Sequence, residues 1–175
     1  MSTHNPNFID SYYQLRKQID DRAKELSQLH TDHLKCRKGC DSCCESIHVF
    51  PLEFSAIKRE LKLQGRGLPV RKFNKFRKSC VFLKDGACSI YYSRPIICRT
   101  QGLPLMYQNL SGKGYEISHC QLNFTAFDLS NFTVDNSMYM PDFNSKLFLL
   151  NKEYVELEDL HNKNPKKRIP LYKLA

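Results

Sequence analysis

The feature that most constrains the fold of this chain is a run of four cysteines within nine residues. The run covers residues 36–44 and contains Cys36, Cys40, Cys43 and Cys44. Four more cysteines follow it, namely Cys80, Cys88, Cys98 and Cys120. Thiolate sulfur is a soft ligand that selects zinc, iron and iron–sulfur clusters over hard cations. The density and spacing of these thiols predict a metal centre, and all eight are candidate metal ligands.

A regular helix over residues 36–44 cannot bring all four thiols of the run to one ion. Cys36 and Cys44 would lie roughly 12 Å apart along such a helix, at ~1.5 Å per residue. Thiolates around one zinc ion, each ~2.3 Å from it, must lie within about 4 Å of one another. Either the chain coils at Gly39, where a left-handed turn is available, or the ligands spread over a larger cluster or two ions.

Cys43 and Cys44 are adjacent, and adjacent side chains diverge in most backbones. One of the pair is therefore predicted to be a second-site ligand, an exchangeable ligand or a reactive thiol. His48 and His119 lie near cysteines in the sequence and are secondary candidates for a mixed site, although a surface or core histidine is the favoured interpretation of each.

Length and composition favour one cytosolic domain over a disulfide-stapled module. A chain of 175 residues is most simply a single domain, residues 1–175, and can bury ~70% of its unfolded surface without cross-links. The segment Met1 to Asn7 is polar, and no run approaches the ~20 apolar residues of a membrane span. We therefore expect reduced cysteines in the cytoplasm and no membrane partner. Four disulfides would suit the even number of cysteines only if this expectation were wrong.

The net charge of +9 does not by itself indicate a nucleic-acid partner. If all eight cysteines bound two divalent ions as thiolates, the charge would fall to about +5. Residues 71–78 alternate cations with Phe73 and Phe76, which could form a nucleic-acid strip. The two phenylalanines are spaced for one helical face, so a helix with a solvated basic side is favoured. Nucleic acid is a disfavoured partner.

Hydrophobic periodicity predicts a helix near each end of the chain. Residues 7–34 form one long amphipathic helix, with apolar positions at Phe8, Tyr12, Leu15, Ile19, Ala23, Leu26 and Leu29. Residues 144–160 form a second flanking helix, and residues 164–168 form a solvated basic end. A third helix is predicted over residues 53–62, because Pro51 and Glu53 suit a helix start.

Short strands and turns are predicted between these helices, in the metal-binding region 36–120. Residues 47–50 form a strand, residues 80–91 form a hairpin that turns at Asp85-Gly86, and residues 101–118 contain a second hairpin. In a strict two-residue turn Leu83 opposes Cys88. Cys80 can then share a centre with Cys88 only beside a bulge or odd loop, or just before the pairing. A short helical turn follows Arg94-Pro95.

These elements define the predicted fold class. It is α+β and mainly helical, with a small cysteine-rich metal-binding core, a short β-hairpin, and flanking N- and C-terminal helices.

Several ordered motifs resemble the zinc- or iron-chelating cysteine-cluster family, known by its Cys-x-x-Cys-x-x-Cys-Cys signature. Here the cluster is Cys36-x3-Cys40-x2-Cys43-Cys44, one residue longer in its first gap. The second half matches more closely, with Cys80-Val-Phe-Leu, Gly86-Ala-Cys88-Ser-Ile-Tyr91 and Arg94-Pro-x-x-Cys98-Arg99. The resemblance spans about residues 36–100, with Cys120 as a later ligand. It implies that zinc or iron is the bound metal.

The resemblance also implies an enzyme alternative. Some relatives are flagellin lysine N-methylases thought to carry an iron–sulfur cluster, which suggests S-adenosylmethionine-dependent methylation of protein lysine. The spacing Cys36-x3-Cys40-x2-Cys43 is similar to that of radical S-adenosylmethionine enzymes, so it can hold a 4Fe-4S cluster. The roughly 130 residues after the motif are too few for their usual barrel. Arg94 and Arg99 could donate to thiolates or bind an anionic cofactor, and hydrogen bonds to nearby carbonyls are the alternative.

The main hypothesis is a cytosolic metal-binding protein that holds zinc, iron or an iron–sulfur centre through clustered thiolates. A metal- or Fe–S-dependent protein-modifying enzyme is the first alternative, and a nucleic-acid-binding zinc module is the second. The expected partners are the metal ion and a protein partner or substrate.

Overall fold

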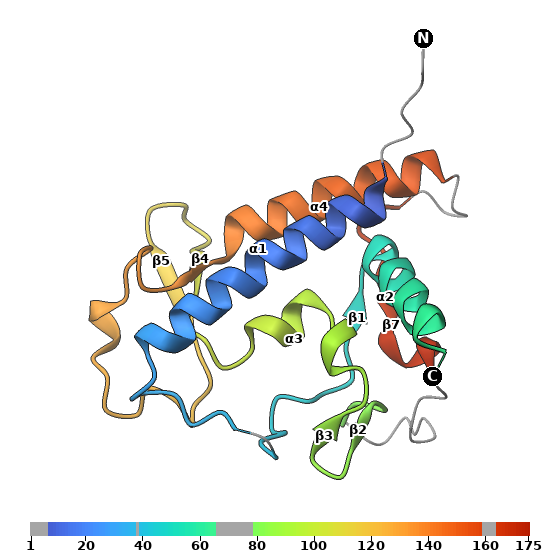
Figure 1. The fold of residues 1–175 in the computed structure, drawn as a ribbon. Coiled ribbons are helices and arrows are strands. Elements are labelled where there is room, and N and C mark those ends of the chain that lie inside the picture. Colours follow the sequence, from blue (N-terminus) through green and yellow to red (C-terminus); the bar gives the residue numbers. More distant parts are fainter. Residues whose placement is uncertain (1–6, 38, 66–78, 159–163) are drawn as a thin grey trace.

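The computed structural model describes residues 7–37, 39–65, 79–158 and 164–175. Within these residues the α-helices are α1 (Phe8–Leu29), α2 (Pro51–Gln64), α3 (Ile96–Thr100) and α4 (Met140–Leu157). α1 and α4 lie side by side and run in opposite directions, and α2 packs against both (Figure 1). The predicted fold class, α+β and mainly helical with flanking helices, is confirmed. The basic segment predicted over residues 71–78 lies outside the described residues.

α1 confirms the long amphipathic helix, but its predicted end at residue 34 is wrong. The predicted apolar stripe is largely buried, with Leu26 fully enclosed, but Leu29 is 61% exposed because the helix stops there. The stop coincides with a tertiary contact of His30. The His30 ring packs edge-on against Phe124 and Phe132, and its Nε2 lies 2.7 Å from the Asn136 carbonyl oxygen.

α2 and α4 begin earlier than predicted. α2 begins at Pro51, two residues before Glu53, and ends at Gln64, followed by Gly65 in the left-handed conformation (φ +62°). α4 begins at Met140 with a proline in its first turn, four residues before the predicted start. Each of these helices has a proline in its first turn. Proline suits this position because it has no backbone N–H, and the first turn of a helix cannot pair its N–H groups within the helix. Residues 159 and 160 of the second flanking helix lie outside the described part of the chain.

The strands form small sheets around the helices. β2 (Leu83–Lys84) and β3 (Ala87–Cys88) pair antiparallel with Leu83 opposite Cys88, which confirms the two-residue turn at Asp85-Gly86. Cys80 lies before this pairing, one of the arrangements left open by the sequence. β4 (Leu105–Gln108) lies between antiparallel β5 (Tyr115–Ser118) and parallel β6 (Met138–Tyr139). Short 3-10 turns cover Tyr91–Ser93, Leu129–Asn131 and Leu171–Leu174.

The predicted solvated basic segment, residues 164–168, is mostly exposed, but the chain does not end there. Lys166 and Lys167 are exposed as predicted, but the chain then returns to the body of the protein. β7 (Ile169–Pro170) pairs antiparallel with β1 (His48–Val49), and the backbone N–H of Leu171 donates to the Ile47 carbonyl at 2.9 Å. Leu171 is buried because it joins an apolar cluster.

Two apolar clusters fill the described interior. The first joins α1, α2 and α4 to the start of α3 and to β4 and β6. The second lies under α2, the β2–β3 hairpin and the chain end, and both Cys80 and Cys88 pack against it. No helix among the described residues is long and apolar enough to span a membrane.

A buried carboxyl group positions α3. Glu53 of α2 is 3% exposed, and its Oε1 accepts hydrogen bonds from the Tyr12 hydroxyl of α1 at 3.0 Å and from the Ile96 backbone N–H at 2.7 Å. The sequence indicated only a favourable acidic residue in a first turn. In the structure this residue fixes the start of α3, the helix that carries Cys98.

Candidate metal centre

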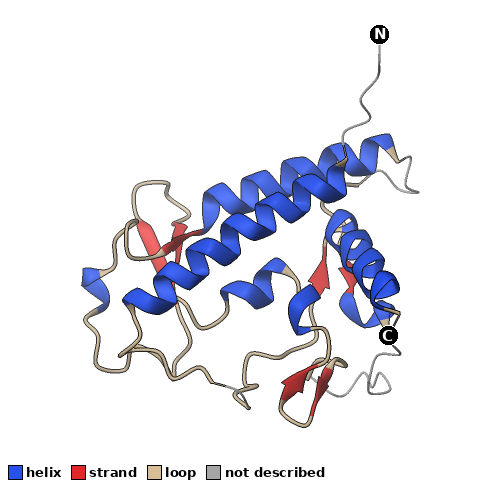
Figure 2. Cartoon of the chain, in the orientation of Figure 1, coloured by secondary structure: helices blue, strands red, loops and turns tan. Residues whose placement is uncertain are grey.

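The cysteines come from segments that lie on the same side of the α1–α4 pair (Figure 1). The segment between α1 and β1 carries the four-cysteine run, and Figure 2 shows that it is mostly loop. Cys80 and Cys88 belong to the β2–β3 region, Cys98 to α3, and Cys120 to the segment after β5. All eight are described, and all are free thiols rather than disulfides.

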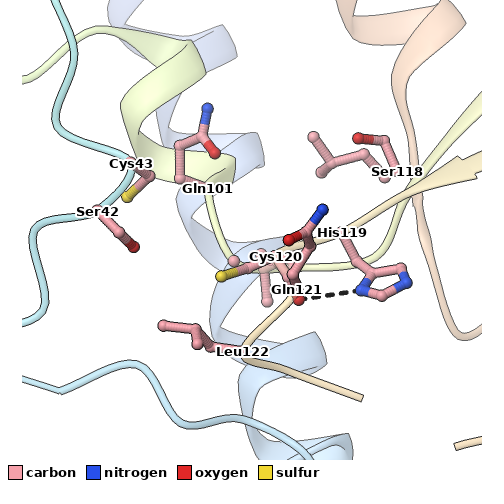
Figure 3. Close-up of a pocket in the computed structure, with 11 residues that line it drawn as sticks. Ser42, Cys43, Gln101, Ser118, His119, Cys120, Gln121 and Leu122 are labelled. Atoms are coloured by element: carbon pink, nitrogen blue, oxygen red, sulfur yellow. Dashed lines mark hydrogen bonds between the residues drawn. The ribbon is translucent and has the colours of Figure 1, made fainter. Parts of the chain in front are cut away.

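Cys43 and Cys120 line one cavity of about 370 Å³. Figure 3 shows their sulfurs on the facing sides of two chain segments that are distant in sequence. The remaining wall contains no Asp, Glu, Lys or Arg and is formed by Ser42, Gln101, Gly102, Leu103, Leu105, Ser118, His119, Gln121 and Leu122. The cavity therefore combines thiols, other polar groups and leucines.

Cys36 is held against the wall of this cavity by Gly102 and Asn123. A Cβ atom on Gly102 would lie 2.6 Å from the Cys36 sulfur, so this approach needs glycine. Gly102 also has a φ of +92°, where side chains are strained. The buried Asn123 amide donates to the Cys36 sulfur at 3.3 Å and to the Gly102 carbonyl at 2.7 Å. Its Oδ1 accepts the Lys35 backbone N–H at 2.8 Å.

Electrostatics groups a fourth thiol with these three. Burial raises the pKa of Cys43, and negative charge on Cys36, Cys40 and Cys120 raises it further. We call these four cysteines the cavity set; it comprises Cys36, Cys40, Cys43 and Cys120. Cys36 and Cys43 are exposed, and the other two are half-buried.

Cys44 turns instead toward the hairpin region. Its carbonyl accepts the Cys80 backbone N–H at 2.9 Å, and the next residue, Glu45, forms an antiparallel bridge with Ser79. Burial raises the pKa of Cys44 to about 11, with contributions from negative charge on Cys43, Cys88 and Cys80. Burial also raises the pKa of Cys98 to about 12, with Cys80, Cys88, Glu53 and Cys44 adding to the effect. We call the second group the buried set, since none of its thiols is exposed; it comprises Cys44, Cys80, Cys88 and Cys98, all half-buried.

Donor groups surround two sulfurs of the buried set. Burial raises the pKa of Cys80, and hydrogen bonds from the backbone N–H groups of Phe82 and Leu83 partly offset that rise. Burial likewise raises the pKa of Cys88, while the Ile90 N–H and the positive charge of Arg94 oppose the rise. These donors would stabilise sulfur in its thiolate form.

The matched family agrees with this chemistry. Residues 35–121 match the model of the CxxCxxCC family, whose description is "Putative zinc- or iron-chelating domain". Residues 35–121 are a CxxCxxCC domain. The predicted resemblance is confirmed, and the match extends past the expected residue 100 to include Cys120. Neither the curated proteins nor the solved structures include a significant match to the chain.

The donor groups of the CxxCxxCC domain fit a thiolate-bound metal. Buried Ser89 Oγ and Arg94 Nε have no hydrogen-bond partner among the described residues, although both belong to the chain beside Cys88. Either could donate to a metal-bound thiolate. Within the described ranges, no three Cys, His, Asp or Glu side chains stand as a ready ligand set. The thiols of each set would therefore have to turn toward a common point on binding.

The two arginines predicted for cofactor binding have other partners. Arg99 is an enclosed residue of α3 whose Nη1 donates to both carboxylate oxygens of Asp20, at 2.8 and 2.6 Å. It also donates hydrogen bonds to the backbone carbonyls of Arg94 and Tyr92. Hydrogen bonds to nearby carbonyls were the alternative role predicted for this arginine. The Arg94 guanidinium lies 3.7 Å from the centre of the Tyr91 ring. A cofactor-binding role for Arg94 and Arg99 stays a prediction.

Of the histidines, His119 lines the cavity of the CxxCxxCC domain, whereas His48 is exposed in β1. His119 Nδ1 lies 3.0 Å from the Cys120 carbonyl oxygen. Sequence reasoning missed Gly102 and Asn123, although the first is one of only seven glycines. Asn123 carried no distinguishing signal, because the same Asn-Phe-Thr triplet recurs at residue 131.

Proposed function

We propose that the CxxCxxCC domain binds zinc or iron through its cysteine thiolates. The observation that supports this most strongly is the gathering of eight free thiols from four chain segments at one side of the helices. Cysteines that only packed in the interior as reduced thiols would not need to gather from distant segments. Soft, divalent or cluster-bound metals are the cations that such a donor set selects.

A bound cation would supply the positive charge that clustered thiolates need. Thiolates placed together repel one another, and the metal provides the opposing charge. The N–H donors at Cys80 and Cys88 and the Asn123 amide at Cys36 would remain as hydrogen bonds to metal-bound sulfur. Such outer donors orient ligands and tune the metal. All eight cysteines are proposed ligands.

Metal analysis of the purified full-length chain tests the proposal. The protein is prepared anaerobically without added metal, and zinc, iron and acid-labile sulfide are measured. We expect at least one equivalent of zinc or iron per chain, and a brown protein with sulfide would identify an iron–sulfur cluster such as 4Fe-4S. Cys40→Ser should lower the metal content, whereas Ser46→Ala, at an exposed serine just after the run, should not. Less than half an equivalent in the parent protein would refute the function.

The proposal includes a reducing compartment, the cytoplasm, because thiolate ligation needs cysteines that are not oxidised. We propose no nucleic-acid partner, since the basic segment at residues 71–78 was better explained as a helix. A protein partner or substrate is compatible with the two exposed thiols of the cavity set, Cys36 and Cys43.

A second candidate function is S-adenosylmethionine-dependent methylation of protein lysine. The cavity supports it, because about 370 Å³ falls within the ~300–1,000 Å³ of small-molecule sites. Thermal unfolding with and without S-adenosylmethionine discriminates the two functions. A ligand at 100 times its dissociation constant adds ~2.7 kcal/mol to stability, so an unchanged midpoint at saturating S-adenosylmethionine would eliminate this candidate.

A further inference from the structure

The adjacent residues Cys43 and Cys44 lead to two different places in the structure. Cys43 lines the cavity together with Cys120, as Figure 3 shows. Cys44 is tied to the hairpin region by the hydrogen bond from the Cys80 N–H to its carbonyl, at 2.9 Å. The thiols near the cavity and those near the hairpin therefore separate at the peptide bond between Cys43 and Cys44.

We propose that the eight cysteines form two separate four-thiolate metal centres, a permanent structural centre in the buried set and an exchangeable centre in the cavity set. This inference rests on the proposed metal-binding function and adds to it the number of centres, their ligands and their different roles. Four thiolates complete the tetrahedral shell of a zinc ion, and each set supplies four.

The buried set lies where a metal ion would join elements of the fold. Cys80 and Cys88 pack against the second apolar cluster, which includes the β2–β3 hairpin, α2 and the chain end. Cys98 is on α3, whose start is fixed by the buried Glu53. A metal bound among these segments would cross-link the hairpin, α3 and the loop after α1. Its release would require those elements to separate, so the centre should exchange slowly.

The cavity set is accessible. Cys36 and Cys43 are exposed, and the cavity beside them is lined by no Asp, Glu, Lys or Arg. A chelator or a small ligand could therefore reach a metal there without unfolding the protein and without meeting an acidic, lysine or arginine side chain. The link from Asn123 to Gly102 and Cys36 keeps one ligand in position within this open site. Exchange at this centre should be fast.

The test measures zinc release from the full-length protein loaded with zinc under reducing conditions. The chromogenic chelator 4-(2-pyridylazo)resorcinol is added in excess, and absorbance is followed over time. We expect two equivalents of zinc in the parent protein, released in two phases of equal amplitude whose rates differ at least tenfold. Cys120→Ser should lose the fast phase and keep the slow one. Cys88→Ser should lose the slow phase and lower the thermal midpoint far more.

Three results would overturn the inference while leaving metal binding intact. They are a total of one equivalent, a single release rate for both equivalents, and loss of both equivalents in Cys120→Ser. The last variant is the decisive one, because Cys120 lies outside both apolar clusters, and circular dichroism verifies its helices. If Cys88→Ser fails to fold, the parent kinetics and Cys120→Ser still decide. Absence of any metal from the parent protein would instead refute the proposed function itself.

Discussion

Two residues, Gly102 and Asn123, hold Cys36 at the cavity, and Gly102 is the more sensitive of them to substitution. Its position combines a φ of +92° with a sulfur atom 2.6 Å from where a Cβ atom would stand. Asn123 then bridges the Gly102 carbonyl and the Cys36 sulfur from a fully enclosed position. One methyl group at Gly102 should therefore displace a proposed ligand.

Gly102→Ala should weaken metal binding at the cavity set and destabilise the protein. A left-handed backbone costs an alanine ~1–2 kcal/mol, and overpacking against the sulfur adds ~1–3 kcal/mol. Gly112→Ala is the matched control, since Gly112 also has a positive φ, +70°. A Cβ atom added there would have the Gln108 Nε2 as its nearest neighbour, at 3.8 Å. Zinc content and urea unfolding of both variants provide the readout. Equal losses in the two variants would contradict a special role for Gly102.

Asn123→Asp should also disturb Cys36, by a different route. The substitution keeps the shape but removes the Nδ2 donor, which leaves the Gly102 carbonyl unpaired and adds a buried acid beside a sulfur. We expect a loss of at least ~1–3 kcal/mol in the free energy of unfolding and faster zinc release. Asn131→Asp, at the exposed copy of the Asn-Phe-Thr triplet, should change stability by less than ~0.5 kcal/mol. Similar behaviour of the two variants in urea unfolding would refute the assignment.

Among the elements, α2 links the helical layer to the cysteine-bearing part of the chain. Its Glu53 accepts hydrogen bonds from Tyr12 of α1 and from the first residue of α3. Burial raises the pKa of Glu53, while the hydrogen bonds from Ile96 and Tyr12 and the charges of Arg168 and Arg99 oppose the rise. This one side chain therefore couples the packing of α3 to pH.

Glu53→Gln should gain stability relative to the parent as pH rises. Below the unfolded pKa of ~4.3 the parent carboxyl is protonated in both states and costs nothing. As pH rises toward the higher folded pKa, ionisation favours the unfolded chain, and above it the cost is constant. Glutamine keeps the acceptor oxygen without this cost. Urea unfolding of both proteins at pH 4 and pH 8 measures the difference, and a smaller advantage at pH 8 would contradict the raised pKa.

Glu53→Ala separates the hydrogen bonds from the charge. It leaves the buried Tyr12 hydroxyl and the Ile96 N–H without their acceptor, at ~1–3 kcal/mol for each group. We expect destabilisation at both pH values, together with faster release of the slow zinc. If alanine were as stable as glutamine at pH 4, the hydrogen bonds would contribute nothing.

Periodicity identified the helices but not their ends, and the reason is tertiary. The apolar stripe of α1 is visible in sequence because it repeats at helical spacing, whereas the stop at Leu29 coincides with the His30 ring meeting Phe124 and Phe132. Phe124 and Phe132 lie 94 and 102 residues after His30 in the sequence. The hairpin turn at Asp85-Gly86 was predictable because its chemistry is local. β6 and β7 were missed because each has only two residues and pairs with a strand that is distant in sequence, so neither periodicity nor a hairpin turn marks it.

At the scale of the whole molecule, the α1–α4 helix pair and the cysteines occupy different parts of the structure. The first apolar cluster, built mainly on α1, α2 and α4, contains no cysteine, whereas the second includes Cys80 and Cys88 at its edge. The sequence predicted eight ligand candidates, but their division into two sets depends on the loop after α1. Spacing alone could not show which neighbour each thiol meets.

Removing the metal should loosen the cysteine region and spare much of the helical layer. Four-thiolate zinc sites contribute ~10–16 kcal/mol of apparent binding energy, so loss of the buried set should release the hairpin and the segment at residues 36–44. Hydrogen exchange before and after chelation checks this, as does Cys88→Ser. We expect faster exchange over residues 79–98 and little change in the middle of α1 and α4. Unchanged protection throughout would make both centres peripheral to the fold.

The pairing of β1 with β7 also sets an order of events during synthesis. His48 pairs with Pro170, so the partner of β1 leaves the ribosome only after every cysteine has emerged. The thiols are thus presented to cellular metal and to oxidants before the strand that covers the second cluster is available. Metal capture by the nascent chain can precede closure of the fold, and a chain that is arrested between Cys120 and residue 169 has all eight cysteines but lacks the partner strand of β1.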